Sequence, residues 1–154
     1  LDSLPADQLE SLDLSSNAFA GSLTPQVGTL QSLTSLLLGN NSIDGSIPSE
    51  IGECTNLQRL ELNGNLRMSG SVPSTMKQLV DLEAVHLQNT NLAGDLDSVL
   101  CSASFLSDPI DSLQADCSVA NGNNATTAFA EVTCTCCTSC CETANDGTSR
   151  CTAL

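Results

Sequence analysis

Cysteine thiols are the most reactive side chains of this 154-residue chain, and eight of its nine cysteines lie at residue 101 or later. The eight are Cys101, Cys117, Cys134, Cys136, Cys137, Cys140, Cys141 and Cys151. Thiols at this density either pair as disulfides or, as thiolates, bind Zn²⁺ or Cu(I). Residues 107–154 hold too few large apolar side chains for a core of their own, so cross-links are the expected source of order.

Two short motifs favour disulfides over metal thiolates. Asn40-Asn41-Ser42 and Asn124-Ala125-Thr126 match the acceptor pattern for N-glycosylation, which makes Asn40 and Asn124 candidate glycan sites. Glycosylation points to an oxidising compartment, where disulfides persist. We therefore expect four disulfides, with Cys101 as a tether and the pairing left open. A metal–thiolate cluster is the alternative.

No other set of reactive side chains has a spacing that predicts chemistry. His86 is the single histidine, and no nucleophile or second metal ligand lies close to it in the sequence. The C-terminal aspartates lack the loop spacing of a calcium site. These residues are Asp95, Asp97, Asp108, Asp111 and Asp116. Nucleophile elbows and phosphate-binding glycine loops are also absent, so we predict no enzyme, no cofactor and no metal.

A repeat of about two dozen residues organises the chain ahead of the cysteines. The matching segments are Leu9-x-x-Leu12-x-Leu14-x-x-Asn17, Leu33-x-x-Leu36-x-Leu38-x-x-Asn41, Leu57-x-x-Leu60-x-Leu62-x-x-Asn65 and Leu82-x-x-Val85-x-Leu87-x-x-Thr90. Each leucine run predicts a short strand with alternate side chains inside, and each following Asn can bond backbone groups of neighbouring repeats. Thr90 replaces this Asn, so the predicted asparagine ladder ends there.

The second half of each repeat carries a glycine and then an apolar segment. Gly21, Gly45, Gly70 and Gly94 supply turns, and a proline after two of them should stop a short edge segment from pairing further. Segments such as Val27-Gly28 and Ile51-Gly52 predict short helical turns on the convex side. Cys54 occupies a slot that holds leucine in other repeats, so it is interpreted as a core residue.

The pattern L-x-x-L-x-L-x-x-N-x-L-x-G-x-I-P-x-x-I-G-x-L, over roughly residues 9–100, resembles the plant-type leucine-rich-repeat family. Departures are local, with Thr24 and Asp97 in place of proline and an insertion at Arg67-Met68. The resemblance implies an α/β solenoid that is right-handed, has about four coils and carries a concave parallel sheet. The cysteine-dense ending is similar to that of secreted diatom and stramenopile leucine-rich-repeat proteins. We expect a solenoid at residues 1–106 and an irregular, disulfide-rich C-terminal cap at 107–154.

Composition limits the partners. Eighteen acids against four bases give a net charge of −14, which disfavours nucleic acid and anionic membrane surfaces. No apolar run is long enough to span a membrane. The sequence begins partway through a repeat, which indicates a processed or truncated piece. Cysteines and glycosylation motifs together predict a secreted or cell-surface protein.

A solenoid offers surfaces more readily than pockets, so recognition is the expected function. The candidate ligand-binding residues face solvent on the concave strands: Asp13, Leu37, Arg59, Glu61, His86 and Gln88. Their expected ligand is a protein, peptide or glycan. The alternative is a structural or adhesive subunit that self-associates through the solenoid ends and the cysteine-rich tail.

Overall fold

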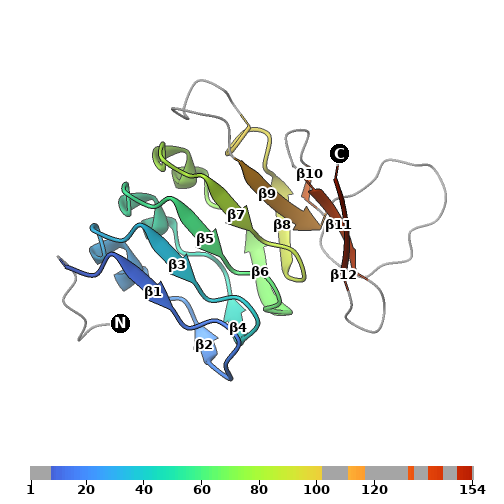
Figure 1. Ribbon diagram of the computed structural model, residues 1–154, viewed down its shortest axis with the longest axis horizontal. Coiled ribbons are helices and arrows are strands. Elements are labelled where there is room, and N and C mark those ends of the chain that lie inside the picture. The colour runs from blue at the N-terminus through green and yellow to red at the C-terminus, as the bar shows by residue number, and fades with distance from the viewer. Residues whose placement is uncertain (1–7, 102–110, 117–131, 134–138, 144–148, 154) are drawn as a thin grey trace.

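The computed structural model in Figure 1 describes residues 8–101, 111–116, 132–133, 139–143 and 149–153. Its largest layer is a seven-stranded sheet, named here the main sheet. In spatial order the strands are β1 (Ser11–Asp13), β3 (Ser35–Leu37), β5 (Arg59–Glu61), β7 (Ala84–His86), β9 (Ser112–Asp116), β11 (Ser139–Thr143) and β12 (Ser149–Ala153). The first six are parallel, and β12 pairs antiparallel with β11.

The strands of the main sheet stack with equivalent repeat positions side by side. Leu12, Leu36, Leu60, Val85 and Leu113 are aligned across β1 to β9. The last four of these side chains are fully buried, whereas Leu12 is half-buried at the end of the stack. The predicted alternation of inward leucines and outward polar residues is therefore confirmed.

A second parallel sheet of five strands runs along the other edge of each repeat. Its strands are β10 (Val132–Thr133), β8 (Asn91–Asp95), β6 (Arg67–Ser71), β4 (Ser42–Gly45) and β2 (Ala20–Ser22). The sequence predicts only a short edge segment here, because the glycine-containing runs have little apolar alternation. Met68, within the insertion, is still buried in the core, as Ile43 and Leu92 of the neighbouring strands are.

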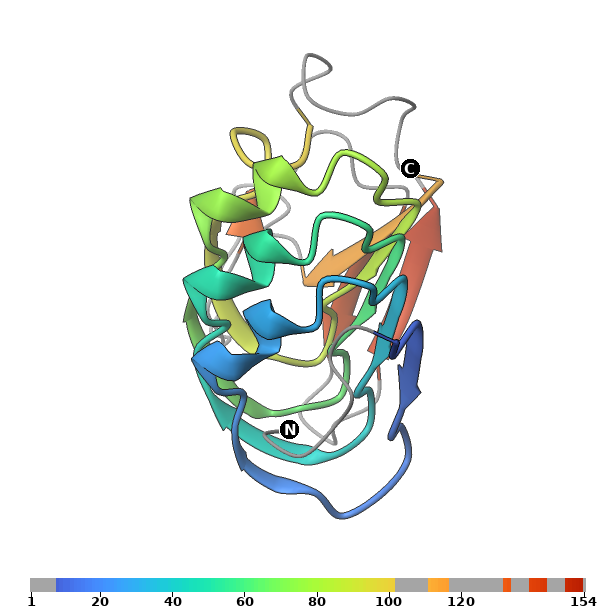
Figure 2. The same ribbon diagram turned by 90° about the vertical axis from the view of Figure 1, so that its left-hand side faces the viewer.

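Short 3₁₀ helices form the side opposite the main sheet, as Figure 2 shows. They are η1 (Pro25–Thr29), η2 (Ser49–Glu53) and η3 (Ser74–Gln78), and they confirm the predicted helical turns. Pro48 and Pro73 directly precede η2 and η3. Proline suits this place because a helix start leaves its N–H groups unpaired anyway.

Asparagine side chains connect consecutive repeats, as predicted. Asn41 Nδ2 donates to Leu14 O and Leu38 O, both at 2.9 Å. Asn65 Nδ2 repeats the pattern one unit later, with Leu38 O at 3.1 Å and Leu62 O at 2.8 Å. The residue before each ladder position has a positive φ, including Asn40 at 56° and Gly64 at 73°. The ladder therefore follows a left-handed turn, for which asparagine and glycine are favoured.

The main sheet continues past the expected end of the repeats at residue 106. β9 pairs with β7 with Leu113 opposite Val85, and Leu113 and Ala115 extend the core. The expectation of an irregular segment is wrong for the described residues after 106, because they form β9 to β12. The domain division at 106/107 stays a prediction, and strand pairing crosses it.

Cys54 is a buried core residue, as predicted from its slot. It is a free thiol with no exposed surface, and its Sγ donates to Val27 O at 3.2 Å. Burial, and to a lesser degree the negative charge of Glu53, raises the pKa of the Cys54 thiol from 9.0 to about 11. The folded protein thus keeps this proton where the unfolded chain has lost it.

We expect this thiol to make the free energy of unfolding depend on alkaline pH. Its contribution is complete below pH 9 and is lost as pH rises from 9 to 11, by up to about 3 kcal/mol. Urea unfolding at pH 8 and pH 10.5 would measure the loss, with Cys54→Ala as the control, because other groups titrate equally in both proteins. A difference between the two proteins that stays constant with pH contradicts the prediction.

Candidate functional site

The outer face of the main sheet brings most of the predicted site residues into one row. Strand register places Asp13, Leu37, Glu61 and His86 side by side on β1, β3, β5 and β7, and Gln114 on β9 continues the row. We call these five residues the middle row. Gln88 follows β7, and Arg59 lies two residues before Glu61 on β5.

Hydrogen bonds order the part of this face that includes β7 and β9. His86 Nε2 lies 2.9 Å from Ser112 Oγ, and Gln88 Nε2 donates to Gln114 Oε1 at 2.9 Å. On the other side, His86 Nδ1 lies 3.6 Å from Glu61 Oε1. The side chains of His86 and Glu61 are 22% and 28% exposed, so both are held but still accessible.

Sequence reasoning missed Ser112 and Gln114, although a signal for them exists. Ile110-x-x-Leu113-x-Ala115 repeats the strand pattern 28 residues after Leu82, instead of the usual 24 or 25. A search that tolerates a longer repeat and alanine in the last slot would have placed both polar residues on the outer face.

A hydroxyl, an imidazole and a carboxylate follow one another on this face, in Ser112, His86 and Glu61. The same order of groups activates the nucleophile of serine hydrolases. Such a reaction also needs N–H donors for the developing oxyanion. The backbone amides of Leu62, Leu87 and Ser112 instead donate to carbonyls of neighbouring strands. The 3.6 Å separation between His86 and Glu61 is also longer than a hydrogen bond. The array therefore orients His86 on the surface, and these three amides are not available to an oxyanion.

Asp13 and Leu37 differ from the rest of the middle row in their surroundings. Ser15 donates its hydroxyl to Asp13 Oδ1 at 2.6 Å and its backbone N–H at 3.0 Å. These two bonds, the hydroxyl first, lower the pKa of the Asp13 carboxyl, so it stays ionised over a wider acid range. Leu37 is only half-buried and points away from the core that contains its neighbours Leu36 and Leu38.

Three polar atoms on this face are buried and have no hydrogen-bond partner among the described residues. They are Ser35 Oγ, Asn63 Oδ1 and Gln88 Oε1. Asn63 lies against Gly39 of the adjacent repeat, and a Cβ added at Gly39 would come within 2.7 Å of its Oδ1. Buried acceptors without donors cost free energy, so this face holds unsatisfied bonding capacity.

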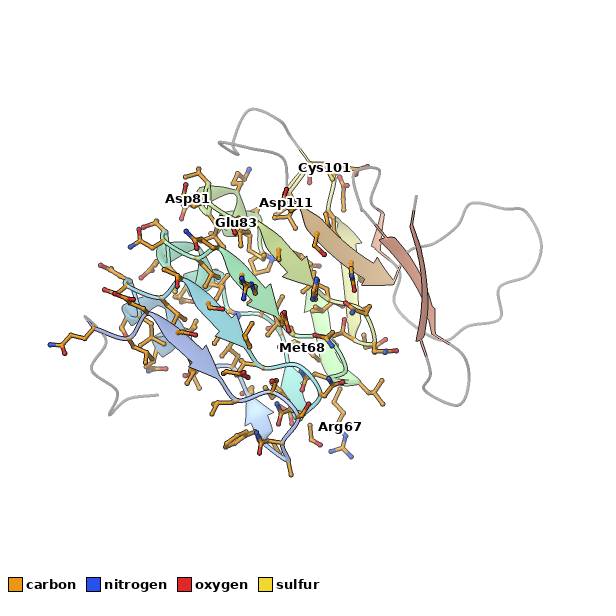
Figure 3. All side chains as sticks on the ribbon, viewed as in Figure 1. Arg67, Met68, Asp81, Glu83, Cys101 and Asp111 are labelled. Atoms are coloured by element: carbon orange, nitrogen blue, oxygen red, sulfur yellow. The ribbon has the colours of Figure 1, made fainter. Side chains whose placement is uncertain are left out.

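Acidic side chains border the main sheet, as Figure 3 shows for Asp81, Glu83 and Asp111 near the start of β7 and β9. Of the four basic residues, Arg67 lies on β6, Lys77 lies on η3, and Arg150 lies on β12, outside the described side chains. Arg59 is the remaining one, and it lies on the outer face. Within the described residues, no group of three His, Cys, Asp or Glu side chains could hold a metal ion.

Other predicted sites are described only in part. Asn40 is exposed beside the end of β3, which is compatible with an attached glycan, whereas Asn124 lies outside the described residues. Cys101 is disulfide-bonded, and its partner is not among the described side chains. The remaining predicted disulfide cysteines also lie outside them: Cys117, Cys134, Cys136, Cys137, Cys140, Cys141 and Cys151. No helix in the described ranges is both long and apolar enough to span a membrane.

Comparison with known proteins agrees with this architecture. Residues 7–66 match the family described as leucine rich repeat. No curated protein matches the chain. One similar solved structure is the ectodomain of the plant membrane receptor kinase GASSHO1/SCHENGEN3 from Arabidopsis thaliana, in complex with CASPARIAN STRIP INTEGRITY FACTOR 2. It is 36% identical, with a TM-score of 0.61, over 70% of this chain and 12% of that chain.

Two further structures have the same fold. The plant peptide hormone receptor RGFR1 in complex with RGF2 is 38% identical over 70% of this chain and 18% of that chain, with a TM-score of 0.58. A plant ice-binding protein is 25% identical over 70% of this chain and 33% of its own, also with a TM-score of 0.58. The chain thus spans a third or less of each of these three proteins. The matches and the stacked parallel strands support a plant-type leucine-rich-repeat protein with a solenoid-like fold.

Proposed function

We propose that the chain is the recognition module of an extracellular or cell-surface protein and binds a peptide or protein segment on the outer face of the main sheet. The observation that carries this proposal is the middle row with its ordered neighbours. Hydrogen bonds at 2.9 Å hold His86 and Gln88, while Asp13, Leu37 and Glu61 remain accessible. Preorganised polar groups beside an accessible apolar side chain suit binding, because little side-chain entropy remains to be lost.

Similar proteins give independent support for a peptide or protein ligand. RGFR1 is a peptide hormone receptor, and its structure contains RGF2. Another similar structure, 30% identical with a TM-score of 0.60, is of PEPR1 with AtPEP1. The ice-binding relative is a reminder that one fold serves several functions, so the proposal rests on the site.

The size of the face limits what it can bind alone. The five strands that carry the middle row are about 4.8 Å apart, and those of three residues are about 10 Å long, so this part of the face presents roughly 240 Å². A stable protein interface takes about 800 Å² from each partner. A short extended peptide fits the smaller area, whereas a folded protein would need adjoining surface or further repeats. A glycan is the other ligand class of similar dimensions.

Selection from a phage-displayed library of random 12-residue peptides would test the site directly. We expect the wild type to enrich a consensus, and the triple variant Asp13→Asn, Glu61→Gln, His86→Gln to lose at least about tenfold in affinity for it, because three polar contacts are removed. The control carries Glu50→Gln and Glu53→Gln on η2 and should bind as the wild type does. Unchanged binding by the triple variant would show that the site lies elsewhere. If the protein selects no peptide but binds on a glycan array, the ligand is a glycan and not a peptide.

Assembly is the second candidate, and one observation favours it. Leu9, Leu12, Leu14 and Leu23 of the first repeat are only half-buried, and Phe19 is 48% exposed. Their counterparts in the next repeat are buried. Apolar side chains that stay accessible on the first described repeat favour association with a second copy. Light scattering with and without reductant separates the candidates, since a monomer supports recognition and a reductant-sensitive polymer supports assembly through the tail.

A further inference from the structure

The middle row contains an apolar residue flanked by two acids. Leu37 on β3 is opposite Asp13 on β1 and opposite Glu61 on β5. Adjacent strands are about 4.8 Å apart, so the two acidic positions are separated by about 10 Å with the leucine between them. Because Leu37 faces outward and is half-buried, it forms an accessible apolar platform that contributes little to the core.

Each of the two carboxylates keeps one oxygen available. Both bonds from Ser15 go to Asp13 Oδ1, and the approach of His86 is to Glu61 Oε1. No described residue donates to the other oxygen of Asp13 or of Glu61. On both sides of Leu37 in the middle row, the face therefore offers carboxylate acceptors.

A complementary group must supply donors only and must also have an apolar stem. Lysine and arginine side chains meet both conditions, since their charged ends donate and do not accept, and their methylene stems pack on apolar surface. Asp and Glu side chains would be repelled, and Asn or Gln would leave an acceptor facing carboxylates. The net charge of −14 adds a long-range attraction for a cationic segment.

We propose that the outer face between β1 and β5 binds a lysine or arginine side chain of an extended peptide. The stem lies on Leu37, and the charged end lies between Asp13 and Glu61. This inference rests on the proposed function and specifies the chemistry of its ligand. Arg59, two residues before Glu61 on the same strand, repels a cation at the start of β5 and so favours a position nearer Glu61.

The test is an NMR titration of the isotope-labelled full chain with N-acetyl-arginine amide. N-acetyl-citrulline amide is the matched probe, because it has nearly the same shape without the charge. We expect arginine to perturb the Leu37 methyl resonances and to bind at least about fivefold more tightly than citrulline, as for an accessible ion pair. The affinity should fall as NaCl is raised from 20 to 300 mM.

Variants distinguish this site from general attraction to an acidic protein. Asp13→Asn and Glu61→Gln should each weaken arginine binding about two- to fivefold, and Leu37→Ser should weaken it similarly. Arg59→Gln should tighten it, because a repelling charge is removed. Glu53→Gln, on η2, has the same charge change as Glu61→Gln and should have little effect. Equal effects of Glu53→Gln and Glu61→Gln, or equal binding of citrulline, would overturn the inference.

The peptide selection separates this inference from the proposed function. The selected consensus could lack lysine and arginine while the triple variant still fails to bind it. That result would support the recognition site but contradict the proposal that it binds a cationic side chain. If the triple variant instead binds the consensus peptide as tightly as the wild type does, the proposed recognition site itself is wrong.

Discussion

Replacing Asn65 with alanine is expected to lower the free energy of unfolding by about 3–5 kcal/mol. The Asn65 side chain has no exposed surface and makes three hydrogen bonds. It donates to Leu62 O at 2.8 Å and to Leu38 O at 3.1 Å, and it accepts from Ile43 N at 3.0 Å. Leu38 O keeps a bond from Asn41, but the other two groups lose the bonds from Asn65, and alanine also leaves a cavity.

Urea unfolding of matched variants tests this prediction. Asn17 has the same repeat position but is exposed, and Leu14 O, which it contacts, also accepts from Asn41. Asn17→Ala should therefore cost less than about 1 kcal/mol. Asn65→Thr should lie between, because Thr90 shows that a hydroxyl at this position donates to the carbonyl three residues earlier, at 2.7 Å. Equal losses for Asn17→Ala and Asn65→Ala would show that the ladder bond is not the cause.

The first repeats were predictable because their signals are local and repeated. Leucines at fixed spacing give the strand, and one Asn per repeat gives the ladder that Asn41 and Asn65 make. The second sheet was missed because its segments, such as Ala20–Ser22, carry no alternation of apolar and polar residues. Their pairing comes from the stacking of neighbouring repeats, which already places the backbones side by side.

The candidate site was predictable in its rows but not in its partners. Once Leu12, Leu36 and Leu60 are inward, Asp13, Leu37 and Glu61 must face outward together. The bond of His86 to Ser112 depends on β9, whose repeat is longer than the others, so that regular spacing did not reveal it. Predicting this bond requires knowing that β9 pairs with β7, and the repeat period alone does not give that pairing.

Replacing Gly52 with alanine is the other substitution with a large expected effect, a loss of about 2–3 kcal/mol in the free energy of unfolding. Gly52 is buried in η2, where the next helix packs closely. A Cβ at this position would lie 2.5 Å from Thr75 O and 2.7 Å from Thr75 Cβ. Both atoms belong to rigid parts of η3, and the Thr75 hydroxyl is bonded back to Ser49 O, so the helix cannot move away freely.

The repeats themselves supply the control for this prediction. Gly28 has the same position in η1 and faces Glu50 O of η2, whereas Lys77 has it in η3, the last of the three helices. Glycine is thus present in η1 and η2, where the helix of the next repeat packs against it. It is replaced in η3, because the next repeat has a turn at residues 97–100 in place of a helix. Lys77→Ala should change stability by less than about 1 kcal/mol. Thermal unfolding of the two variants measures the difference. If Gly52→Ala is as stable as Lys77→Ala, close packing between helices is not the reason for glycine at position 52.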